Sequence, residues 1–288
     1  MKQTLIIGAG PAGISASLYL ARSGKTAVTV VTNGESALAK ADLIENYFGF
    51  AQPISGKKLI EDSRKNAERL GVTFVDSELV ELQINMDMKF DAETADGEKN
   101  TYDSVLIATG ASRTTPRIKG LKELEGKGVS YCAICDAFFY RGKPVAVIGA
   151  GEYALHEALT LSNTSSAVTV LTDGKEPSFE KNEKVSCDTR KIAEITGSGK
   201  VEAVIFEDGE KLDISGIFIA VGTAGSTALA RKVGTPLDGN KIMVDENRAT
   251  AVPGLFAAGD CIGGLLQVSK AVADGAIAAM SMIRFLSE

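Results

Sequence analysis

Two cysteines separated by two residues are the groups in this chain best suited to redox chemistry. Cys132 and Cys135 lie in the stretch Cys132-Ala-Ile-Cys135. Thiols at this spacing can close into a disulfide and reopen, and so store two electrons. The pair lies between two glycine-rich fingerprints of dinucleotide-binding folds, at residues 8–13 and 149–154. Because such folds can hold a flavin, the sequence predicts electron transfer from a flavin through the dithiol to the disulfide of another protein.

The other cysteines and the single histidine form no recognisable metal or disulfide framework. Besides the pair, the chain has only Cys187, Cys261 and His156, whereas structural zinc sites generally use four Cys or His ligands. We therefore expect no metal site and interpret Cys187 and Cys261 as core residues and His156 as an ordinary helix residue. A single CxxC pair is typical of redox proteins of the cytoplasm, which is the predicted location.

Length and charge narrow the class of protein. The 288 residues, 44% hydrophobic and 24% charged, are ordinary for a globular protein and suggest about two domains. The net charge of −6 gives no support for nucleic-acid binding. No uninterrupted apolar run reaches transmembrane length, so we expect no membrane association. Residues 1–7 run directly into the first fingerprint, and we expect them to form a strand rather than a removable signal.

The first fingerprint, Gly8-Ala-Gly10-Pro-Ala-Gly13, lies between a predicted strand at 4–7 and a predicted helix, and a further strand follows at 28–32. Gly8 permits a tight turn, Gly10 lets the backbone approach a pyrophosphate, and Gly13 lets the helix pack closely on the strand. The N-terminus of the helix then offers N–H groups to phosphate. This βαβ arrangement predicts a dinucleotide site.

The same pattern returns in the second half of the chain. A strand is predicted at 144–148, the second fingerprint at 149–154, a helix at 155–163 and a strand at 167–171. Repetition of one supersecondary unit indicates a duplicated domain.

Each copy is followed by a buried-strand pattern that ends in glycine, at 105–110 and at 217–222. A last strand at 255–260 and a helix at 268–286 would complete the first copy. We therefore predict an α/β protein with two Rossmann-like dinucleotide-binding domains, the second inserted into the first and carrying the CxxC site.

These motifs together resemble the low-molecular-weight thioredoxin reductase family, over essentially the whole chain. The stretches that carry the resemblance are Leu5-Ile-Ile-Gly-Ala-Gly-Pro-Ala-Gly13, Ile44-Glu-Asn-Tyr47, Leu106-Ile-Ala-Thr-Gly-Ala111, Gly128-Val-Ser-Tyr-Cys-Ala-Ile-Cys-Asp-Ala-Phe-Phe-Tyr140 and Gly254-Leu-Phe-Ala-Ala-Gly-Asp260.

The resemblance implies FAD as the cofactor of the first domain. It places Asp260 at the ribityl or phosphate region, and Gln267 and Val268 at a helix N-terminus that faces the flavin ring. The full set of FAD-binding residues that it implies is Gly8, Gly10, Pro11, Ala12, Gly13, Thr32, Asn33, Asn46, Ala108, Thr109, Gly110, Gly259, Asp260, Gln267 and Val268.

The resemblance also assigns roles around the CxxC pair. Cys135 would face the flavin, Cys132 would attack the partner's disulfide, and Asp136 would protonate the departing thiolate. Thioredoxin is the implied substrate, and a homodimer is the implied assembly.

The domain boundaries follow from the same match. We predict an FAD-binding domain at 1–114 plus 245–288 and an inserted redox-active disulfide domain with a degenerate NADPH-binding fold at 115–244. The crossovers would lie near 112–117 and 243–247.

The chain departs from the family pattern at three places. Glu35-Ser-Ala37 replaces Gly-Gly-Gln, and Phe48-Gly49 replaces Pro-Gly, and both would alter local FAD contacts. The third departure concerns NADPH: the His-Arg-Arg cluster that follows the second strand of the inserted domain is replaced by Thr172-Asp-Gly-Lys-Glu-Pro177. A 2′-phosphate needs cationic partners, and Glu152-Tyr153 puts a carboxylate and a bulky ring where phosphates would lie. This pattern is similar to ferredoxin-dependent flavin thioredoxin reductases and makes ferredoxin the predicted donor.

Three alternatives stay open at this point. NADH could bind at the second fingerprint with Asp173 on its ribose. The inserted domain could hold a second flavin or another nucleotide. The protein could instead be a flavin-bearing redox sensor whose CxxC pair changes the binding of a partner.

Overall fold

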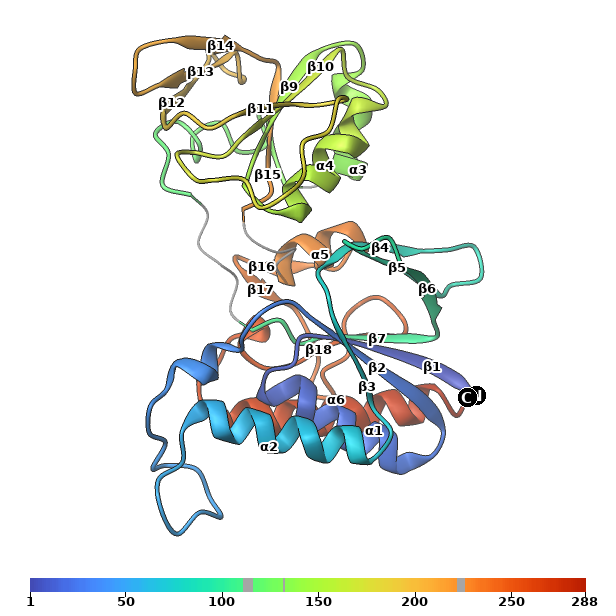
Figure 1. Ribbon diagram of the computed structural model, residues 1–288. Coiled ribbons are helices and arrows are strands. Elements are labelled where there is room, and N and C mark those ends of the chain that lie inside the picture. The colour runs from blue at the N-terminus through green and yellow to red at the C-terminus, as the bar shows by residue number, and fades with distance from the viewer. Residues whose placement is uncertain (111–115, 132, 222–225) are drawn as a thin grey trace. The chain divides into compact units, whose positions relative to one another are not determined.

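The computed structural model describes residues 1–110, 116–131, 133–221 and 226–288, with only the backbone for 134, 135 and 226. The chain divides into two compact units (Figure 1). Unit 1 comprises Met1–Ser112 and Gly225–Glu288, and unit 2 comprises Arg113–Ala224. Unit 2 is thus an insertion in unit 1.

A five-stranded parallel sheet forms the centre of unit 1. Its order is β18-β7-β1-β2-β3, and all four pairings are parallel. The strands are β1 (Lys2–Ile7), β2 (Thr26–Thr32), β3 (Thr73–Asp76), β7 (Ser104–Ile107) and β18 (Leu255–Ala257). Their apolar runs are buried on both faces, as expected for a parallel sheet that is covered on each side.

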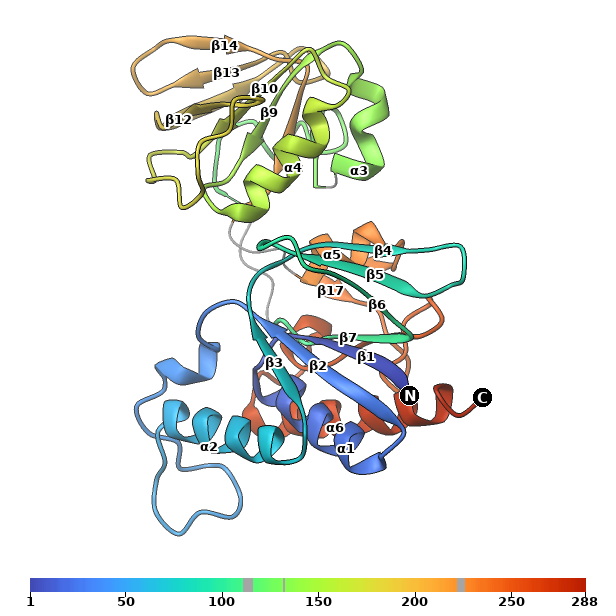
Figure 2. The ribbon, with the colours of Figure 1, turned by 45° about the vertical axis from the view of Figure 1, so that its right-hand side comes forward.

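Helices cover one face of this sheet and a smaller sheet covers the other (Figure 2). The helices are α1 (Pro11–Ser23), α2 (Gly56–Arg69) and α6 (Val268–Phe285). The smaller antiparallel sheet consists of β4 (Leu79–Ile84), β5 (Phe90–Thr94) and β6 (Lys99–Tyr102). None of the helices in the described part of the chain combines the length and apolarity that a bilayer span requires.

Two glycines set the distance between α1 and its neighbours. A Cβ added at Gly13 would lie 2.0 Å from the carbonyl oxygen of Gly8, and one added at Gly275 would lie 2.1 Å from that of Ala12. Both distances are far below van der Waals contact. The first turn of α1 is therefore held against the glycine turn on one side and against α6 on the other.

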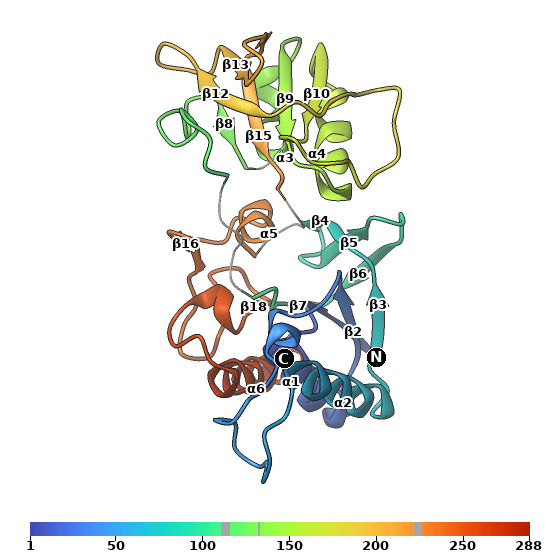
Figure 3. The same cartoon turned by 60° about the vertical axis from the view of Figure 1, so that its left-hand side comes forward.

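Unit 2 repeats this architecture in shorter elements (Figure 3). Its parallel sheet has the order β11-β10-β9-β15-β8. The strands are β8 (Val129–Ser130), β9 (Pro144–Ile148), β10 (Ala167–Leu171), β11 (Ser186–Asp188) and β15 (Gly216–Ile219).

The helices of unit 2 are α3 (Ala133–Asp136), which continues into the 3₁₀ turn η2 (Ala137–Tyr140), and α4 (Glu152–Ser162). An antiparallel sheet is made of β12 (Ile192–Thr196), β13 (Ala203–Phe206) and β14 (Lys211–Asp213). The fingerprint strands β1 and β9 hold the same central place in both units, which confirms the predicted pair of Rossmann-like folds.

The second boundary between the units falls earlier than the sequence suggested. Residues from 226 to 244 belong to unit 1, where they form α5 (Ser226–Lys232), β16 (Leu237–Asp238) and β17 (Lys241–Ile242). The buried ammonium group of Lys232 lies 3.1 Å from a carboxylate oxygen of Glu81 and donates to the carbonyl of Val80 at 3.0 Å. This pairing ties α5 to β4, so residues 243–247 do not connect the units. The predicted crossover at 112–117 falls mostly outside the described residues.

Replacement of Gly275 by alanine tests the close contact between α6 and α1. Alanine usually stabilises a helix interior relative to glycine, but here its Cβ would collide with the Ala12 carbonyl. We expect Gly275→Ala to lower the free energy of unfolding by about 1–3 kcal/mol, measured by urea denaturation. Ser269→Ala, on the exposed face of the same helix, serves as the control and should change stability by less than about 0.5 kcal/mol. A Gly275→Ala protein as stable as the wild type would show that the helices can separate freely.

Candidate functional site

The first glycine turn is packed on its inner side and open on its outer side. Gly8 has a φ of +109°, and a Cβ there would lie 2.5 Å from the carbonyl oxygen of Ala108. A Cβ at Gly10 would meet only the Ser36 hydroxyl, at 3.5 Å. The turn therefore leaves a space over Gly10, as a pyrophosphate requires.

The N-terminus of α1 points its backbone donors into this region. Gly10 is the N-cap and Pro11 is the first helical residue, and no described side chain caps the helix. The first turn contains no acidic residue, so no carboxylate competes with a phosphate for the N–H groups. The residues of this turn, with Ala12 and Gly13, thus fit the diphosphate of FAD.

Two polar groups beside the turn also fit a cofactor. The hydroxyl of Thr109 is buried and has no hydrogen-bond partner among the described atoms, which is unusual for a buried polar group. Its Cα lies 3.1 Å from the position of a Cβ on Gly8. Ser36, which belongs to the Glu35–Ala37 stretch that departs from the family pattern and was not among the predicted cofactor residues, faces Gly10 and also caps the short helix η1 (Ala37–Lys40). Gly110, with a φ of +77°, follows Thr109.

The end of β2 holds the next two predicted residues. Thr32 is the last residue of β2, and the Asn33 amide donates to a carboxylate oxygen of Glu78 at 3.1 Å. Asn33 is therefore held by the buried side chain of Glu78, in the loop that follows β3.

Hydrogen bonds and ion pairs around Asp274 of α6 hold the Gly259–Asp260 turn in place. The buried carboxylate of Asp274, which is 1% exposed, accepts from the Gly259 amide at 3.2 Å. It also pairs with Arg248 at 2.9 Å and with Lys270 at 2.7 Å. A Cβ at Gly259 would lie 3.0 Å from the methyl group of Ala12, so this turn lies against the start of α1.

The start of α6 reaches a residue far away in the sequence. Gln267 is the N-cap of α6, and Val268 is its first residue. The side-chain oxygen of Gln267 accepts from the Asn46 amide at 3.0 Å. These contacts link segments that the sequence separates by more than two hundred residues, as an FAD site in unit 1 requires. Phe48, part of another departure from the family, is 97% exposed in this chain.

The structure describes the redox motif only in part. Cys132 lies outside the described residues, and the backbone of Cys135 lies in α3. Asp136 is the last residue of α3. Burial, and in second place the charge of Asp136, raise the pKa of the Tyr140 phenol. The Tyr140 ring packs edge-on to Phe218 of β15, with centroids 5.3 Å apart. This contact anchors the segment after the CxxC motif to the sheet of unit 2.

The second glycine turn differs from the first because another segment of the chain lies against it. Ser178 donates to the carbonyl of Ala150 from both its amide and its hydroxyl, at 2.7 Å and 3.0 Å. Glu152 is the first residue of α4. Burial, together with the charge of Glu180, raises the pKa of the Glu152 carboxyl. Two carboxylates therefore lie near this helix start.

Tyr153 does not lie at the phosphate position that the sequence predicts for it. Its side chain is 2% exposed and is part of the interior of unit 2, so its ring does not occupy the outer side of the turn. Tyr153 is the second residue of α4, and it is buried like Ala154, which follows it. Only Glu152 of the two residues can oppose a phosphate.

The charged groups that follow β10 and β11 have partners within unit 2. Asp173, at a φ of +53°, accepts from the Ile192 amide at 2.9 Å. Arg190 pairs with Asp188 at 2.7 Å and with Asp208 at 3.2 Å, and lies over the ring of Phe206. Asp173, which the alternative with NADH places on the ribose, therefore already accepts a backbone hydrogen bond, and the guanidinium of Arg190 is paired with two carboxylates.

The two remaining cysteines have different environments. Cys187 is exposed in the edge strand β11, so its interpretation as a core residue was wrong. Cys261 is fully buried, and burial raises the pKa of its thiol to about 12. Cys261 is thus a packing residue that stays protonated.

Comparison with known proteins places the chain in a family. Residues 2–275 match the family described as pyridine nucleotide-disulphide oxidoreductase. The thioredoxin reductase of Aquifex aeolicus is 36% identical over 300 residues, which cover 98% of this chain and 93% of that protein.

Solved structures agree along the whole chain. The crystal structure of the atypical thioredoxin reductase TRi from Desulfovibrio vulgaris Hildenborough is 39% identical with a TM-score of 0.94, covering 100% of this chain and 98% of that one. A ferredoxin-flavin thioredoxin reductase from Clostridium acetobutylicum is 28% identical with a TM-score of 0.74, covering 99% and 98%. The chain therefore belongs to the low-molecular-weight thioredoxin reductases, within the pyridine nucleotide-disulphide oxidoreductase family, and its cofactor is FAD.

Proposed function

We propose that this protein is an FAD-dependent thioredoxin reductase that receives electrons from a reduced ferredoxin rather than from NADPH or NADH. The observation that carries the donor assignment is the second glycine turn, where Ser178 binds the Ala150 carbonyl and Glu152 opens α4. The proposal is supported by the likeness to the ferredoxin-flavin thioredoxin reductase of Clostridium acetobutylicum.

The electrostatics of this turn oppose a pyridine nucleotide. A pyrophosphate would meet the carboxylate of Glu152, with Glu180 close by, instead of unopposed N–H groups. Arg190, which follows β11, is held by two aspartates. Each charge-assisted contact that is lost costs about 1.5–3 kcal/mol, so the loss of two or three weakens binding by roughly two to six orders of magnitude.

The dithiol chemistry follows from the family roles of three residues. FAD, when bound, accepts single electrons and passes them on in pairs. We propose that the Cys132–Cys135 disulfide takes up two electrons at Cys135 and two protons, and so opens to two thiols. Cys132 then attacks a disulfide sulfur of thioredoxin, and Cys135 displaces the resulting mixed disulfide. Asp136 supplies the proton to the departing thiolate.

Two exposed aromatic side chains lie directly after the CxxC helix. Phe138 and Phe139 are 71% and 65% exposed, and their rings meet edge to face with centroids 6.1 Å apart. Exposed aromatic rings beside a reactive group are common anchors in protein interfaces. We propose that Phe138 and Phe139 contact thioredoxin.

The homodimer and the cytoplasmic location remain predictions.

Anaerobic stopped-flow with the FAD-loaded enzyme tests the donor. We expect reduced ferredoxin to bleach the flavin absorbance and to support thioredoxin reduction, and NADPH and NADH at millimolar concentration to leave the flavin oxidised. Dithionite, which needs no binding site, is the control that the flavin can be reduced. Saturable reduction by micromolar NADPH would return the protein to NADPH-dependent chemistry.

The flavin released on denaturation should amount to one FAD per chain, and two per chain would favour a second flavin in unit 2.

Substitution of the cysteines tests the assignment of their roles. Cys132→Ser should abolish thioredoxin reduction and leave a thiolate at Cys135 that gives a long-wavelength charge-transfer band with the oxidised flavin. Cys135→Ser should lose both the band and turnover, and Cys187→Ser should retain activity. A band that appears only in Cys135→Ser would reverse the two roles.

The acidic start of α4 predicts a pH-dependent stability. The folded protein raises the pKa of Glu152, so it holds the proton more tightly than the unfolded chain, and ionisation above that pKa destabilises the fold. Glu152→Gln should therefore raise the melting temperature at pH 7.5 by roughly 1–3 °C, as expected for a destabilisation below about 1 kcal/mol, and by less at pH 4. Glu183→Gln, in an exposed part of the following segment, is the control. An equal rise at both pH values would mean that charge is not the cause.

A further inference from the structure

We infer that Glu157, a buried acid on α4, is a positioning residue that holds the CxxC helix and lowers the reduction potential of the Cys132–Cys135 pair. This inference rests on the proposed redox role of that pair. It adds a residue that neither the CxxC motif nor the glycine fingerprints contain.

The geometry connects the acid directly to the redox helix. The Ala133 amide, the first N–H of α3, donates to Oε2 of Glu157 at 2.9 Å. Ala133 is 0% exposed and Glu157 is 2% exposed. Figure 3 shows α3 beside α4, and the two helices are in contact. The hydrogen bond thus fixes the start of α3 at a point that water does not reach.

The hydrogen bond to Ala133 brings this acid to the peptide bond that follows Cys132 in the chain. Ala133 follows Cys132 directly and precedes Cys135 by two residues, and its amide nitrogen is bonded to the carbonyl carbon of Cys132. A carboxylate that accepts from this N–H therefore brings its charge to the peptide bond between Cys132 and the helix. An uncharged amide side chain could accept the same hydrogen bond, so the charge is a separate property of this site.

The charge acts differently on the two redox states. The disulfide is neutral, whereas the reduced pair carries a thiolate when it reacts, and a nearby negative charge disfavours that thiolate. A reduced form that is destabilised gives a more reducing couple. In the exchange, two electrons leave the dithiol as its disulfide forms and reduce the partner's disulfide to two thiols, with the protons passing to the new thiols. A more reducing pair pushes this equilibrium towards reduced thioredoxin.

Glu157→Gln separates the charge from the hydrogen bond. Glutamine keeps the size of the side chain and an oxygen that accepts from Ala133, but removes the charge. We expect the equilibrium constant for reduction of the pair to rise about tenfold, which for a two-electron couple is about 30 mV. Glu157→Met, which removes charge and acceptor at similar volume, should also raise the potential and should loosen α3 in addition.

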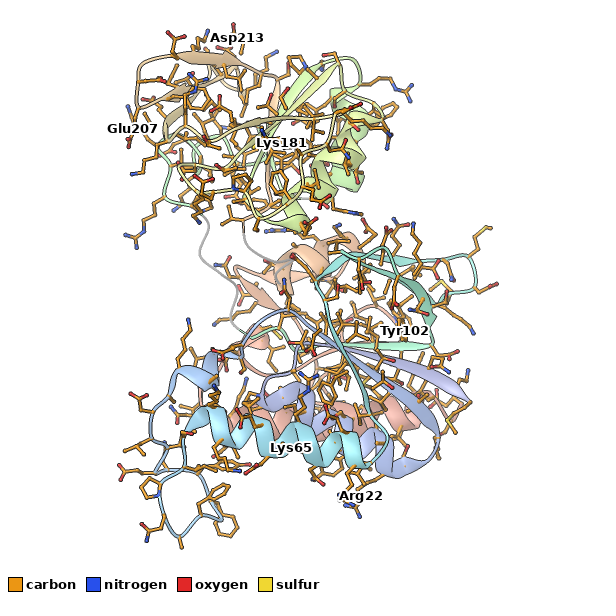
Figure 4. The ribbon with its side chains drawn as sticks, in the orientation of Figure 1. Arg22, Lys65, Tyr102, Lys181, Glu207 and Asp213 are labelled. Carbon is orange, nitrogen blue, oxygen red and sulfur yellow. The ribbon has the colours of Figure 1, made fainter. Side chains whose placement is uncertain are left out.

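The measurement is a redox titration of the FAD-loaded, full-length enzyme at pH 8. The protein is equilibrated without oxygen in reduced and oxidised dithiothreitol, the thiols are alkylated, and the modification of Cys132 and Cys135 is read by peptide mass. Glu207→Gln is the matched control, because Glu207 lies at an exposed edge of unit 2 (Figure 4) and, among the described residues, forms an ion pair with the exposed Lys191. Its potential should equal that of the wild type.

The outcomes distinguish this inference from the proposed function. A wild-type potential in both Glu157→Gln and Glu157→Met would overturn the electrostatic role. A shift confined to Glu157→Met would also overturn it, and would leave only a structural hydrogen bond. If alkylation of the pair does not depend on the dithiothreitol ratio in the wild type, the proposed redox function itself fails. If Glu157→Gln does not fold, an unchanged potential in Glu157→Met overturns the electrostatic role, and a rise of about tenfold in its equilibrium constant for reduction supports that role.

Discussion

The close approach of backbone to backbone around the first glycine turn is the constraint on which unit 1 depends. Gly13 lies against the carbonyl of Gly8, and Gly275 lies against the carbonyl of Ala12, with no room for a Cβ at either place. These contacts fix α1 between the turn and α6. Because the inner side of the turn is filled with backbone, Gly10 is the glycine of this turn over which the described atoms leave space, and the FAD diphosphate is proposed to bind there.

Unit 2 keeps this packing but changes the outer side of the turn. A Cβ at Gly149 would lie 2.2 Å from the carbonyl oxygen of Ala220, so the inner contact is the same kind as at Gly8. The outer side instead receives Ser178 and the charge of Glu152. A duplicated fold can thus retain its architecture while its ligand chemistry changes, because architecture and ligand contacts depend on different faces of the same turn.

Much of the fold could be predicted from the sequence because it repeats a local pattern. The strands at 144–148 and 167–171 lie where the apolar runs placed them, and the glycine spacing located both turns. The antiparallel sheets and α5 were missed, since they depend on pairings between distant residues, such as Lys232 with Glu81 across 151 positions. Cys187 was misplaced because residue type alone does not distinguish an edge strand from a core strand. The contacts of Ser178 with Ala150 and of Glu157 with Ala133 join separate elements, and no short motif encodes them.

The central claim is that the second glycine turn no longer binds a pyridine nucleotide. A calorimetric titration of the oxidised, FAD-loaded enzyme with NADPH tests it most directly, because the experiment reports binding whether or not electrons are transferred. We predict no saturable heat up to millimolar NADPH, and the same result with NADH. A dissociation constant in the micromolar range for either nucleotide, at one site per chain, would contradict this account.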